Sequence, residues 1–266
     1  MRVVVLASLL VALIASAAAA KNWPTPAAGG SVSGDPEVVF TFDDGPNPAF
    51  TPKVLDILAQ HDVKAVFFVV GTMTTKDNKK IPEIFSRILR EGHIIANHTM
   101  THADLCREAT DAVREIDDGT AAIRRIAGVE PVWFRAPYGS RCDRLDAQLA
   151  ERRINHFHWD LDPQEWRHNN GKRTARYVIG RLSRTTGRVV LLLHDIHPAT
   201  VRALPEILTW IEQENIRRKA SGRRPIRIIQ APQLAAEQIS PALAAWVDDA
   251  TMGARSLPAT IANLLP

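Results

Sequence analysis

The 266-residue chain has little cysteine and little excess of charge of either sign. Its two cysteines cannot make a disulfide-rich framework, but the chain is long enough to bury a hydrophobic core without disulfide cross-links. Its 33 lysine and arginine residues nearly balance 29 acidic residues, and a formal charge of +4 does not identify a nucleic-acid-binding protein. Hydrophobic residues make up 45% of the chain, which excludes a disordered chain, a collagen-like repeat and a polytopic membrane protein.

The N-terminal end has the composition of a secretory signal peptide. Its features are a single charge at Arg2, an apolar run over Val3–Ile14, and small residues at Ala18, Ala19 and Ala20. We therefore expect residues 1–20 to be a cleaved signal peptide and the protein to be exported to the periplasm or the extracellular space. The alternative is an uncleaved membrane anchor, because the apolar stretch approaches the ~18 residues that can span a bilayer.

Export also decides how Cys106 and Cys142 are interpreted. In an oxidising compartment two cysteines are candidates for a disulfide, whereas in the cytosol they would stay reduced. A single sequence does not show whether the two residues meet in the fold, so this disulfide stays open at the level of the sequence.

The rest of the chain divides by composition into three parts. Residues 21–36 are rich in proline, glycine, alanine and serine, and we expect them to form a flexible linker. Residues 37–235 are expected to form the main folded domain. Residues 236–266 are expected to form a helical tail packed on the outside of that domain.

Within residues 37–235, short apolar runs alternate with helical patterns. The expected strands are Val38–Phe42, Ala65–Val70, His93–Ala96, Val132–Arg135, Ile154–His158, Val189–Leu193 and Ile226–Ile229. The expected helices include Pro52–Gln60, Pro82–Glu91, Glu108–Ala127, Leu145–Arg152, Thr174–Ser183 and Val201–Lys219. Such alternation predicts an α/β fold with a parallel sheet, and seven units favour a distorted (β/α)7 TIM-like barrel. An open doubly wound sheet is the alternative, but its usual glycine-rich loop is missing after the first strand.

Polar clusters follow five of the expected strands. They are Thr41-Phe42-Asp43-Asp44-Gly45-Pro46-Asn47, Asn97-His98-Thr99-Met100-Thr101-His102, Arg135-Ala136-Pro137-Tyr138, Trp159-Asp160-Leu161-Asp162-Pro163-Gln164-Glu165-Trp166 and His194-Asp195. In barrels of this kind the catalytic groups lie at the C-terminal ends of the strands. The five clusters are therefore expected to surround one mouth of the barrel.

Two of these clusters together predict a metal site. His98 and His102 are four residues apart, so on a helical turn they would share one face with Cβ atoms ~5–6 Å apart. A carboxylate from Asp43 or Asp44 would complete a set of two histidines and one acid that leaves coordination positions open. Zinc suits such a set, although the same ligands accept iron, cobalt or nickel.

The remaining polar residues suggest metal-assisted hydrolysis of an amide or ester. The second acid of the Asp43–Asp44 pair can take a proton from water that the metal activates, and Arg135 is a candidate to orient it. His194 can serve as general acid for a leaving amine. Either Asp162 or Glu165 could support His194. A backbone N–H near Tyr138 could stabilise the tetrahedral oxyanion.

The same residues resemble the ordered motifs of the polysaccharide deacetylases, the NodB-homology group or carbohydrate esterase family four. The motifs are Thr41-Phe42-Asp43-Asp44-Gly45-Pro46, His98-Thr99-x-x-His102, Arg135-x-Pro137-Tyr138, Asp162-x-x-Glu165-Trp166 and Leu191-x-Leu193-His194. The resemblance covers about Val38 to Gln230. It implies a distorted seven-stranded barrel, a divalent metal that is usually zinc, and removal of N- or O-acetyl groups from sugar polymers.

Carried over motif by motif, the resemblance gives each residue a role. It implies Asp43 as the base, Asp44, His98 and His102 as metal ligands, Arg135 as the residue that positions the base, His194 as the acid, and Trp166 and Leu193 as lining of the acetyl pocket. One position departs from the family pattern, because the fourth motif usually ends in Asp-Trp and here ends in Glu165-Trp166. The departure leaves open which acid supports His194.

The sequence thus predicts an exported, metal-dependent deacetylase of N-acetylated glycans such as peptidoglycan or chitin-like oligomers. Two alternatives remain: a hydrolase of the same fold acting on O-acetylated xylan or a small amide, and a catalytically silent carbohydrate-binding barrel. The expected partner is the acetylated polysaccharide, with no nucleic acid and no membrane contact beyond the signal segment. The polymer, the native metal and the oligomeric state are left open.

Overall fold

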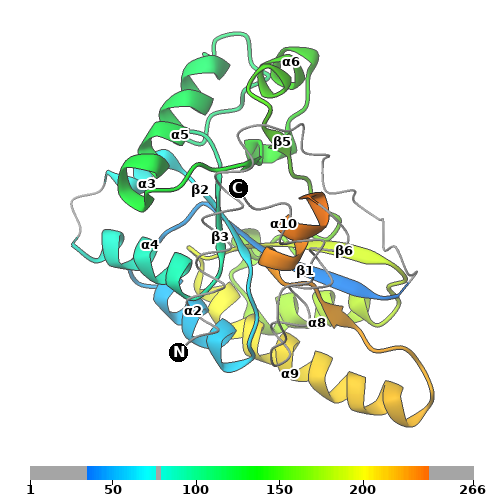
Figure 1. The fold of residues 1–266 in the computed structure, drawn as a ribbon. Helices are drawn as coiled ribbons and strands as arrows, with labels where there is room; N and C mark the ends of the chain where they lie inside the picture. Colours follow the sequence, from blue (N-terminus) through cyan, green and yellow to red (C-terminus); the bar gives the residue numbers. More distant parts are fainter. Residues whose placement is uncertain (1–34, 76–78, 240–266) are drawn as a thin grey trace, which may run out of the picture.

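Figure 1 shows the fold in a computed structural model that describes residues 35–75 and 79–239. The expected signal peptide, residues 21–34 of the expected linker and residues 240–266 of the expected tail lie outside the described residues. In the part of the chain that is described, no helix is long and apolar enough to cross a membrane.

Seven parallel strands form one sheet. They are β1 (Glu37–Asp43), β2 (Val66–Val69), β3 (Ile94–Asn97), β4 (Trp133–Phe134), β5 (Asn155–His156), β6 (Arg188–His194) and β7 (Arg227–Ile228). Their order is β5-β4-β3-β2-β1-β6, and β7 pairs with the first two residues of β1. All seven lie where the sequence predicts strands, although β4 and β5 are only two residues long.

The two edges of this sheet, β5 and β6, approach each other through the segment that follows β5. An isolated parallel bridge joins Leu161, just after β5, to Leu191 in β6, and the Leu192 N–H donates to the Leu161 carbonyl at 2.9 Å. The sheet therefore curves into a barrel that is closed on this side by one bridge instead of a full strand pair. This confirms the predicted distorted α/β barrel.

Helices connect the strands, and most of them cover the outside of the barrel (Figure 1). They are α2 (Thr51–Gln60), α3 (Gly71–Thr74), α4 (Lys80–Arg90), α5 (Ala112–Ala127), the 3-10 turn η2 (Pro137–Gly139), α6 (Asp143–Glu151), α7 (Glu165–His168), α8 (Gly171–Leu182), α9 (Pro198–Ala220) and α10 (Ala231–Ile239). The six long helices predicted from periodicity are all present. The one-turn elements α3, η2 and α7 were not predicted, because three or four residues do not establish a period.

Alternate residues of the strands pack on opposite sides of the sheet. Val38 and Phe40 of β1 join the outer hydrophobic cluster, together with helix residues such as Leu55 and Ile207. Val39 joins an inner cluster formed by strand residues and by α10. Because side chains alternate with period two, Thr41 and Asp43 share the inner face with Val39. The sheet therefore aims both polar residues into the barrel.

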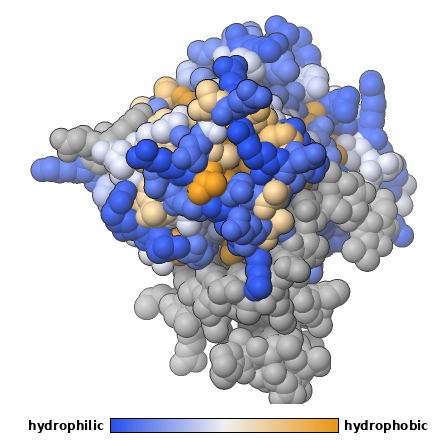
Figure 2. Space-filling model, turned by 90° about the horizontal axis from the view of Figure 1, so that it is seen from above, coloured by the Kyte–Doolittle hydropathy of each residue, from blue (hydrophilic) through white to orange (hydrophobic). Residues whose placement is uncertain are grey.

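Helix α10 packs against this inner face. Ala231, Leu234 and Ala235 belong to the inner cluster and are buried. The helix runs through the expected boundary between residues 235 and 236, so the described chain shows no break between domain and tail there. In the coloured part of Figure 2, polar side chains cover most of the surface, with small apolar areas between them, which fits a core held in internal clusters.

Candidate active site

The ends of three strands bring the predicted catalytic residues together. Asp43 is the last residue of β1 and His194 the last of β6, and the two are register partners in the sheet. His98 directly follows Asn97, the last residue of β3. Asp43 and His98 are buried, so their polar atoms are held away from bulk water.

Asp44, His98 and His102 form a group able to hold a metal ion, with one ligand atom from each lying within 4.8 Å of the others. Asp44 Oδ1 lies 3.4 Å from His98 Nε2 and 3.2 Å from His102 Nε2. Asp44 has a positive φ of 73°, a left-handed backbone conformation that is uncommon for residues other than glycine. Among the residues described by the structure, this is the one such group.

The second ring nitrogen of each histidine is already engaged. His98 Nδ1 lies 2.7 Å from the Arg135 carbonyl oxygen, which can only accept, so Nδ1 carries the proton. His102 Nδ1 lies 3.2 Å from the Tyr138 hydroxyl. These outer contacts direct both Nε2 atoms toward Asp44, as in histidine metal ligands whose other nitrogen is held by a hydrogen bond.

The two histidines do not share a helical turn, which corrects the expectation from their spacing. Residues 98–104 form an irregular loop in which Thr99 and His102 have positive φ values of 69° and 64°. The His102 N–H donates to the Thr99 hydroxyl at 2.9 Å, which closes the loop. A spacing of four residues is compatible with a tight loop as well as with a helix, so spacing alone could not decide between them.

Asn97 anchors this loop, although the sequence placed it only in a polar cluster and gave it no role. Its buried amide donates to the Ile116 carbonyl and the Thr120 hydroxyl, both at 2.9 Å, and accepts from the Thr99 N–H at 2.8 Å. Gly119 of α5 permits the close approach, since a Cβ there would lie 2.8 Å from Asn97 Oδ1. A glycine inside the helix and an asparagine before His98 are the sequence signals of this contact.

The site suits a divalent cation. Asp44 Oδ1 is buried and accepts no well-formed hydrogen bond. Burial disfavours the Asp44 carboxylate, but the His102 and His98 imidazoles beside it outweigh that cost and hold its pKa well below the usual range. An ionised carboxylate oxygen and two imidazole nitrogens are the donor set that zinc and similar metals prefer.

Arg135 holds the other acid. Its Nη1 donates to Asp43 Oδ1 at 2.6 Å and to the Thr41 hydroxyl at 2.9 Å, and its Nε donates to the Phe157 carbonyl at 3.0 Å. The guanidinium is fully buried and stacks on the Phe68 ring, 4.0 Å from its centroid. Asp43 Oδ2 is then left 3.6 Å from His98 Nε2, facing the metal-ligand group.

Glu165 is the acid that contacts His194. Its Oε1 lies 3.0 Å from His194 Nδ1 and accepts the His194 backbone N–H at 2.7 Å. Burial disfavours the His194 imidazolium, but the hydrogen bond and charge of Glu165, with Asp44 and Asp43 nearby, raise its pKa to about 9. The pKa of Glu165 is lowered, because its pairing with His194 outweighs burial.

Asp162 has a different partner. Its Oδ1 accepts the Gln164 backbone N–H at 2.7 Å, which closes the turn before α7. Burial raises the pKa of Asp162. The sequence left undecided which of the two acids supports His194. The longer side chain, Glu165, reaches His194, and the shorter one, Asp162, shapes the turn.

The structure exposes two of the predicted pocket residues and buries a third away from the site. Trp166 on α7 and Tyr138 on η2 are exposed, at 44% and 70% of their surface. Leu193 instead packs in the outer cluster, on the face of β6 opposite to His194. Leu192 alternates with Leu193 and shares the inner face with His194, so the structure corrects the expectation that Leu193 lines the site.

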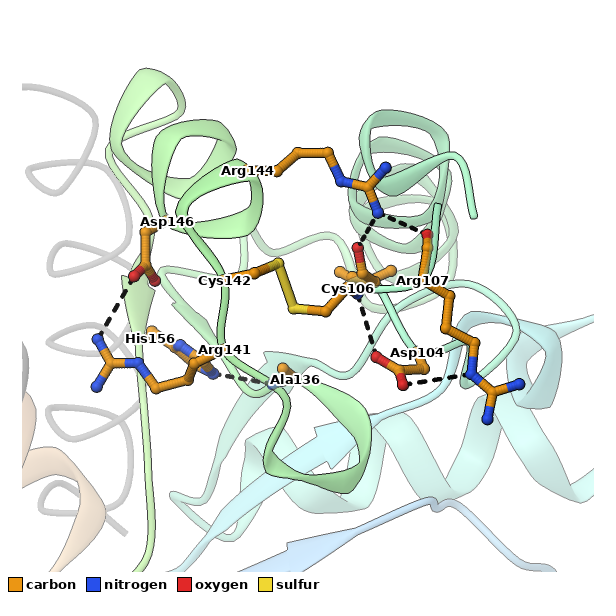
Figure 3. Close-up of a disulfide and its surroundings, with 10 residues drawn as sticks. Asp104, Cys106, Arg107, Ala136, Arg141, Cys142, Arg144, Asp146 and His156 are labelled. Atoms are coloured by element: carbon orange, nitrogen blue, oxygen red, sulfur yellow. Dashed lines mark hydrogen bonds and ion pairs between the residues drawn. A yellow bond between two sulfur atoms is a disulfide. The ribbon is translucent and has the colours of Figure 1, made fainter. Parts of the chain in front are cut away.

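A disulfide between Cys106 and Cys142 links two loops of the site (Figure 3). Cys106 follows His102 in the loop after β3, and Cys142 follows Tyr138 in the segment after β4. Their Cα atoms are 5.9 Å apart. The pairing left open by the sequence is therefore formed, and it ties the metal-ligand loop to the segment that contacts His102.

Asp195 is a second residue that the sequence placed in a polar cluster without giving it a role. It is fully buried, its Oδ2 accepts the Thr51 hydroxyl, and its carboxyl lies against Gly45, where a Cβ would be 2.3 Å from Oδ1. Burial raises the pKa of Asp195 to about 7. The chain that follows Asp43 and Asp44 passes over this carboxyl, and only a glycine at position 45 leaves room for it.

Comparison with known proteins places the chain in a family. A family model described as polysaccharide deacetylase matches residues 31–155. Chitooligosaccharide deacetylase of Bradyrhizobium sp. (strain ANU 289) is 42% identical over 171 residues, which cover 64% of this chain and 75% of that protein. Peptidoglycan-N-acetylmuramic acid deacetylase PdaC of Bacillus subtilis (strain 168) is 35% identical over 172 residues, but the chain spans 35% of its length.

A solved structure titled T48 deacetylase with substrate superimposes with a TM-score of 0.65 at 28% identity. The match covers 78% of this chain and 94% of that one. Sequence and fold therefore agree. The chain belongs to the polysaccharide deacetylase family.

Proposed function

We propose that this protein hydrolyses N-acetyl groups on a sugar polymer such as peptidoglycan or a chitin-like glycan. The observation that carries the proposal is the convergence of Asp44, His98 and His102 beside an acid held by Arg135 and a histidine held by Glu165. The relatives support the same substrate class, since their names are chitooligosaccharide and peptidoglycan deacetylases.

Asp44, His98 and His102 would hold the divalent cation, with zinc as the first choice and cobalt, nickel or iron as alternatives. Such an ion supplies a Lewis acid that lowers the pKa of water and polarises the acetyl carbonyl. The outer contacts from the Arg135 carbonyl and the Tyr138 hydroxyl keep the two imidazoles oriented for this task.

Asp43 acts as the general base in this proposal. One carboxylate oxygen is fixed by Arg135 at 2.6 Å, and the other faces the ligand group. The free oxygen takes a proton from the attacking water, whose oxygen forms a bond to the acetyl carbonyl carbon. Arg135 therefore positions the base without touching the substrate.

His194 acts as the general acid from the neighbouring strand. Its raised pKa keeps the imidazole protonated at neutral pH, so it can donate to the amide nitrogen as the carbon–nitrogen bond breaks. The products are acetate and a free amine on the sugar. The exposed Trp166 beside Glu165 is positioned to contact the acetyl-bearing sugar.

We also propose that the protein works outside the cytoplasm. The expected signal peptide supports export, and the disulfide between Cys106 and Cys142 supports an oxidising compartment. A polymer substrate of the cell wall or of the surroundings is consistent with that location.

The test is acetate release from N-acetylglucosamine oligomers by chelator-treated protein, before and after zinc is restored. We expect activity only after reconstitution. Asp43→Asn should keep its zinc but lose at least about a hundredfold in rate, because a general base contributes 10²–10⁴-fold. Asp143→Asn, an exposed acid on α6, serves as the control and should match the unaltered protein. Zinc-independent acetate release, or full activity in Asp43→Asn, would refute the proposal.

A further inference from the structure

The segment from Trp166 to His194 has an unusual charge. It contains seven of the chain's 33 lysine and arginine residues and none of its 29 acidic residues, so the rest of the chain carries 26 basic against 29 acidic residues. The positive charge of the protein is therefore concentrated in one segment, which comprises most of α7, all of α8 and β6.

Six of the seven lie on the surface and form what we call the basic face: Arg167, Lys172, Arg173, Arg176, Arg181 and Arg184. Lys172, Arg173, Arg176 and Arg181 lie on the solvent side of α8, Arg167 lies in α7, and Arg184 follows the end of α8. Thr174, Ala175, Val178 and Leu182 are buried on its other side. Figure 1 shows α8 on the outside of the molecule, beside α9 and away from α5.

The basic face has no acidic partners within residues 35–75 and 79–239. Arg188, the seventh cation, pairs with Glu37 at 2.8 Å and Glu237 at 2.6 Å, but none of the six exposed cations forms an ion pair with a described residue. Within the described part of the chain, these six charges are therefore uncompensated.

This arrangement is unfavourable for the helix itself. Lys172 and Arg176 are like charges four residues apart, which destabilises a helix by ~0.2–0.5 kcal/mol. The first turn of α8 contains Lys172 and Arg173 and no acid, although the helix dipole favours acids there. Local choices that oppose the fold are expected at functional sites. An anionic partner would relieve both penalties.

The basic face is continuous with the active site. Glu165 and Trp166 open α7, where Glu165 contacts His194. The Arg167 guanidinium lies over the Trp166 ring, 4.7 Å from its centroid. Only two residues separate the end of α7 from the start of α8. Lys172 and Arg173, in the first turn of α8, therefore lie at the mouth end of the barrel. A polymer with one sugar in the site can extend directly onto this face.

We propose that the basic face binds the carboxylates of the substrate polymer, and that this polymer is an anionic N-acetylated glycan such as peptidoglycan. The inference rests on the proposed function and narrows its substrate class. Peptidoglycan carries stem peptides on its lactyl groups, and the free carboxylates of these peptides lie close to the acetamido groups along the strand. Helix α8 has 12 residues and a length of ~18 Å, so the face contacts the polymer beyond the reacting sugar. A neutral chitin oligomer would gain nothing from these contacts.

The test compares soluble peptidoglycan fragments with neutral N-acetylglucosamine oligomers. We expect Arg173→Glu/Arg176→Glu to raise KM for the peptidoglycan fragments about tenfold at low salt, with kcat unchanged. High salt should remove the difference, because it screens exposed charges. Kinetics on the neutral oligomers should not change. The control Arg90→Glu/Arg125→Glu makes the same change in net charge on α4 and α5.

Cosedimentation of the same variants with insoluble peptidoglycan and with chitin adds a readout that needs no catalysis. Weaker sedimentation of the α8 variant with peptidoglycan alone would support the proposal. Equal effects of the two variants, or an effect on neutral substrates as well, would overturn it.

Equally tight binding of the unaltered protein to vesicles containing phosphatidylglycerol would also overturn it, in favour of a membrane surface. Absence of acetate release from every substrate would refute the proposed function, while cosedimentation would still decide the role of the basic face.

Discussion

At the scale of single residues, Arg135 shows how a charge is kept inside the barrel. The guanidinium has no exposed surface, yet it meets a carboxylate, a hydroxyl, a backbone carbonyl and an aromatic face. A buried ion pair has a large desolvation cost, which is tolerable only when both partners are also hydrogen-bonded. The pair therefore serves to orient Asp43, and its removal leaves an unpaired buried charge.

We expect Arg135→Met to lower the free energy of unfolding by about 3–5 kcal/mol, because Asp43 would remain buried without its counter-charge. The double variant Arg135→Met/Asp43→Asn should recover part of this loss. Urea unfolding of the three proteins measures the effect. A single variant as stable as the unaltered protein would show that Asp43 does not depend on Arg135.

The His194–Glu165 pair makes a prediction for pH dependence. Because its pKa is raised to about 9, His194 should stay protonated at neutral pH, and kcat should fall as pH rises through about 9. In Glu165→Gln the carboxylate is lost while burial still lowers the pKa of His194, so the alkaline fall should move to lower pH. Glu165→Asp keeps the charge and should lie closer to the unaltered profile. Identical profiles in all three proteins would exclude Glu165 as the support of His194.

At the scale of elements, the site depends on loops that are held from outside. The loop after β3 is fixed to α5 by Asn97 and to the segment after β4 by the disulfide. Neither anchor contains a proposed metal ligand. Both act on the position of His102, whose Nδ1 also contacts Tyr138 on the other side of the disulfide.

We expect Cys106→Ser/Cys142→Ser to lower the free energy of unfolding by about 3–4 kcal/mol, because the disulfide joins residues 36 positions apart and restricts the unfolded chain. Zinc should also dissociate more readily, since the loop carrying His102 loses a restraint while its ligands are unchanged. Thermal unfolding and competition with a chelator measure the two effects. Unchanged zinc affinity would limit the role of the disulfide to stability.

At the scale of the whole molecule, the site exists only in the folded barrel. Asp44 and the two histidines come from segments more than 50 positions apart, and the sheet order makes them neighbours. A cation that binds this arrangement binds the native state alone. Metal binding and folding are therefore coupled.

Zinc in excess should raise the Tm of the unaltered protein, and a chelator should reverse the change, because a ligand specific to the native state stabilises it. In His102→Ala the rise should largely disappear, since one of three ligands is lost. His61→Ala, which changes a histidine paired with Glu212 on the surface, should respond to zinc like the unaltered protein. A full response of His102→Ala to zinc would argue against the proposed ligand set.

Much of the fold could be predicted because its elements are long and periodic. The seven strands and six helices have apolar patterns that the sheet and its covering helices use directly. The short elements α7 and η2 could not be predicted, because three or four residues do not establish a period. The helical turn expected at His98 and His102 was wrong, since Asn97 fixes that loop to α5 through tertiary hydrogen bonds.

By itself the sequence determined the family, the barrel and the residue types of the site, because motif residues at strand ends are local features of the chain. Tertiary structure decided which of these residues meet. It paired Glu165 with His194, placed Leu192 on the inner face in place of Leu193, and joined Cys106 to Cys142. Side-chain length, strand alternation and loop path determine these contacts. Each contact also depends on where a distant part of the chain comes to lie.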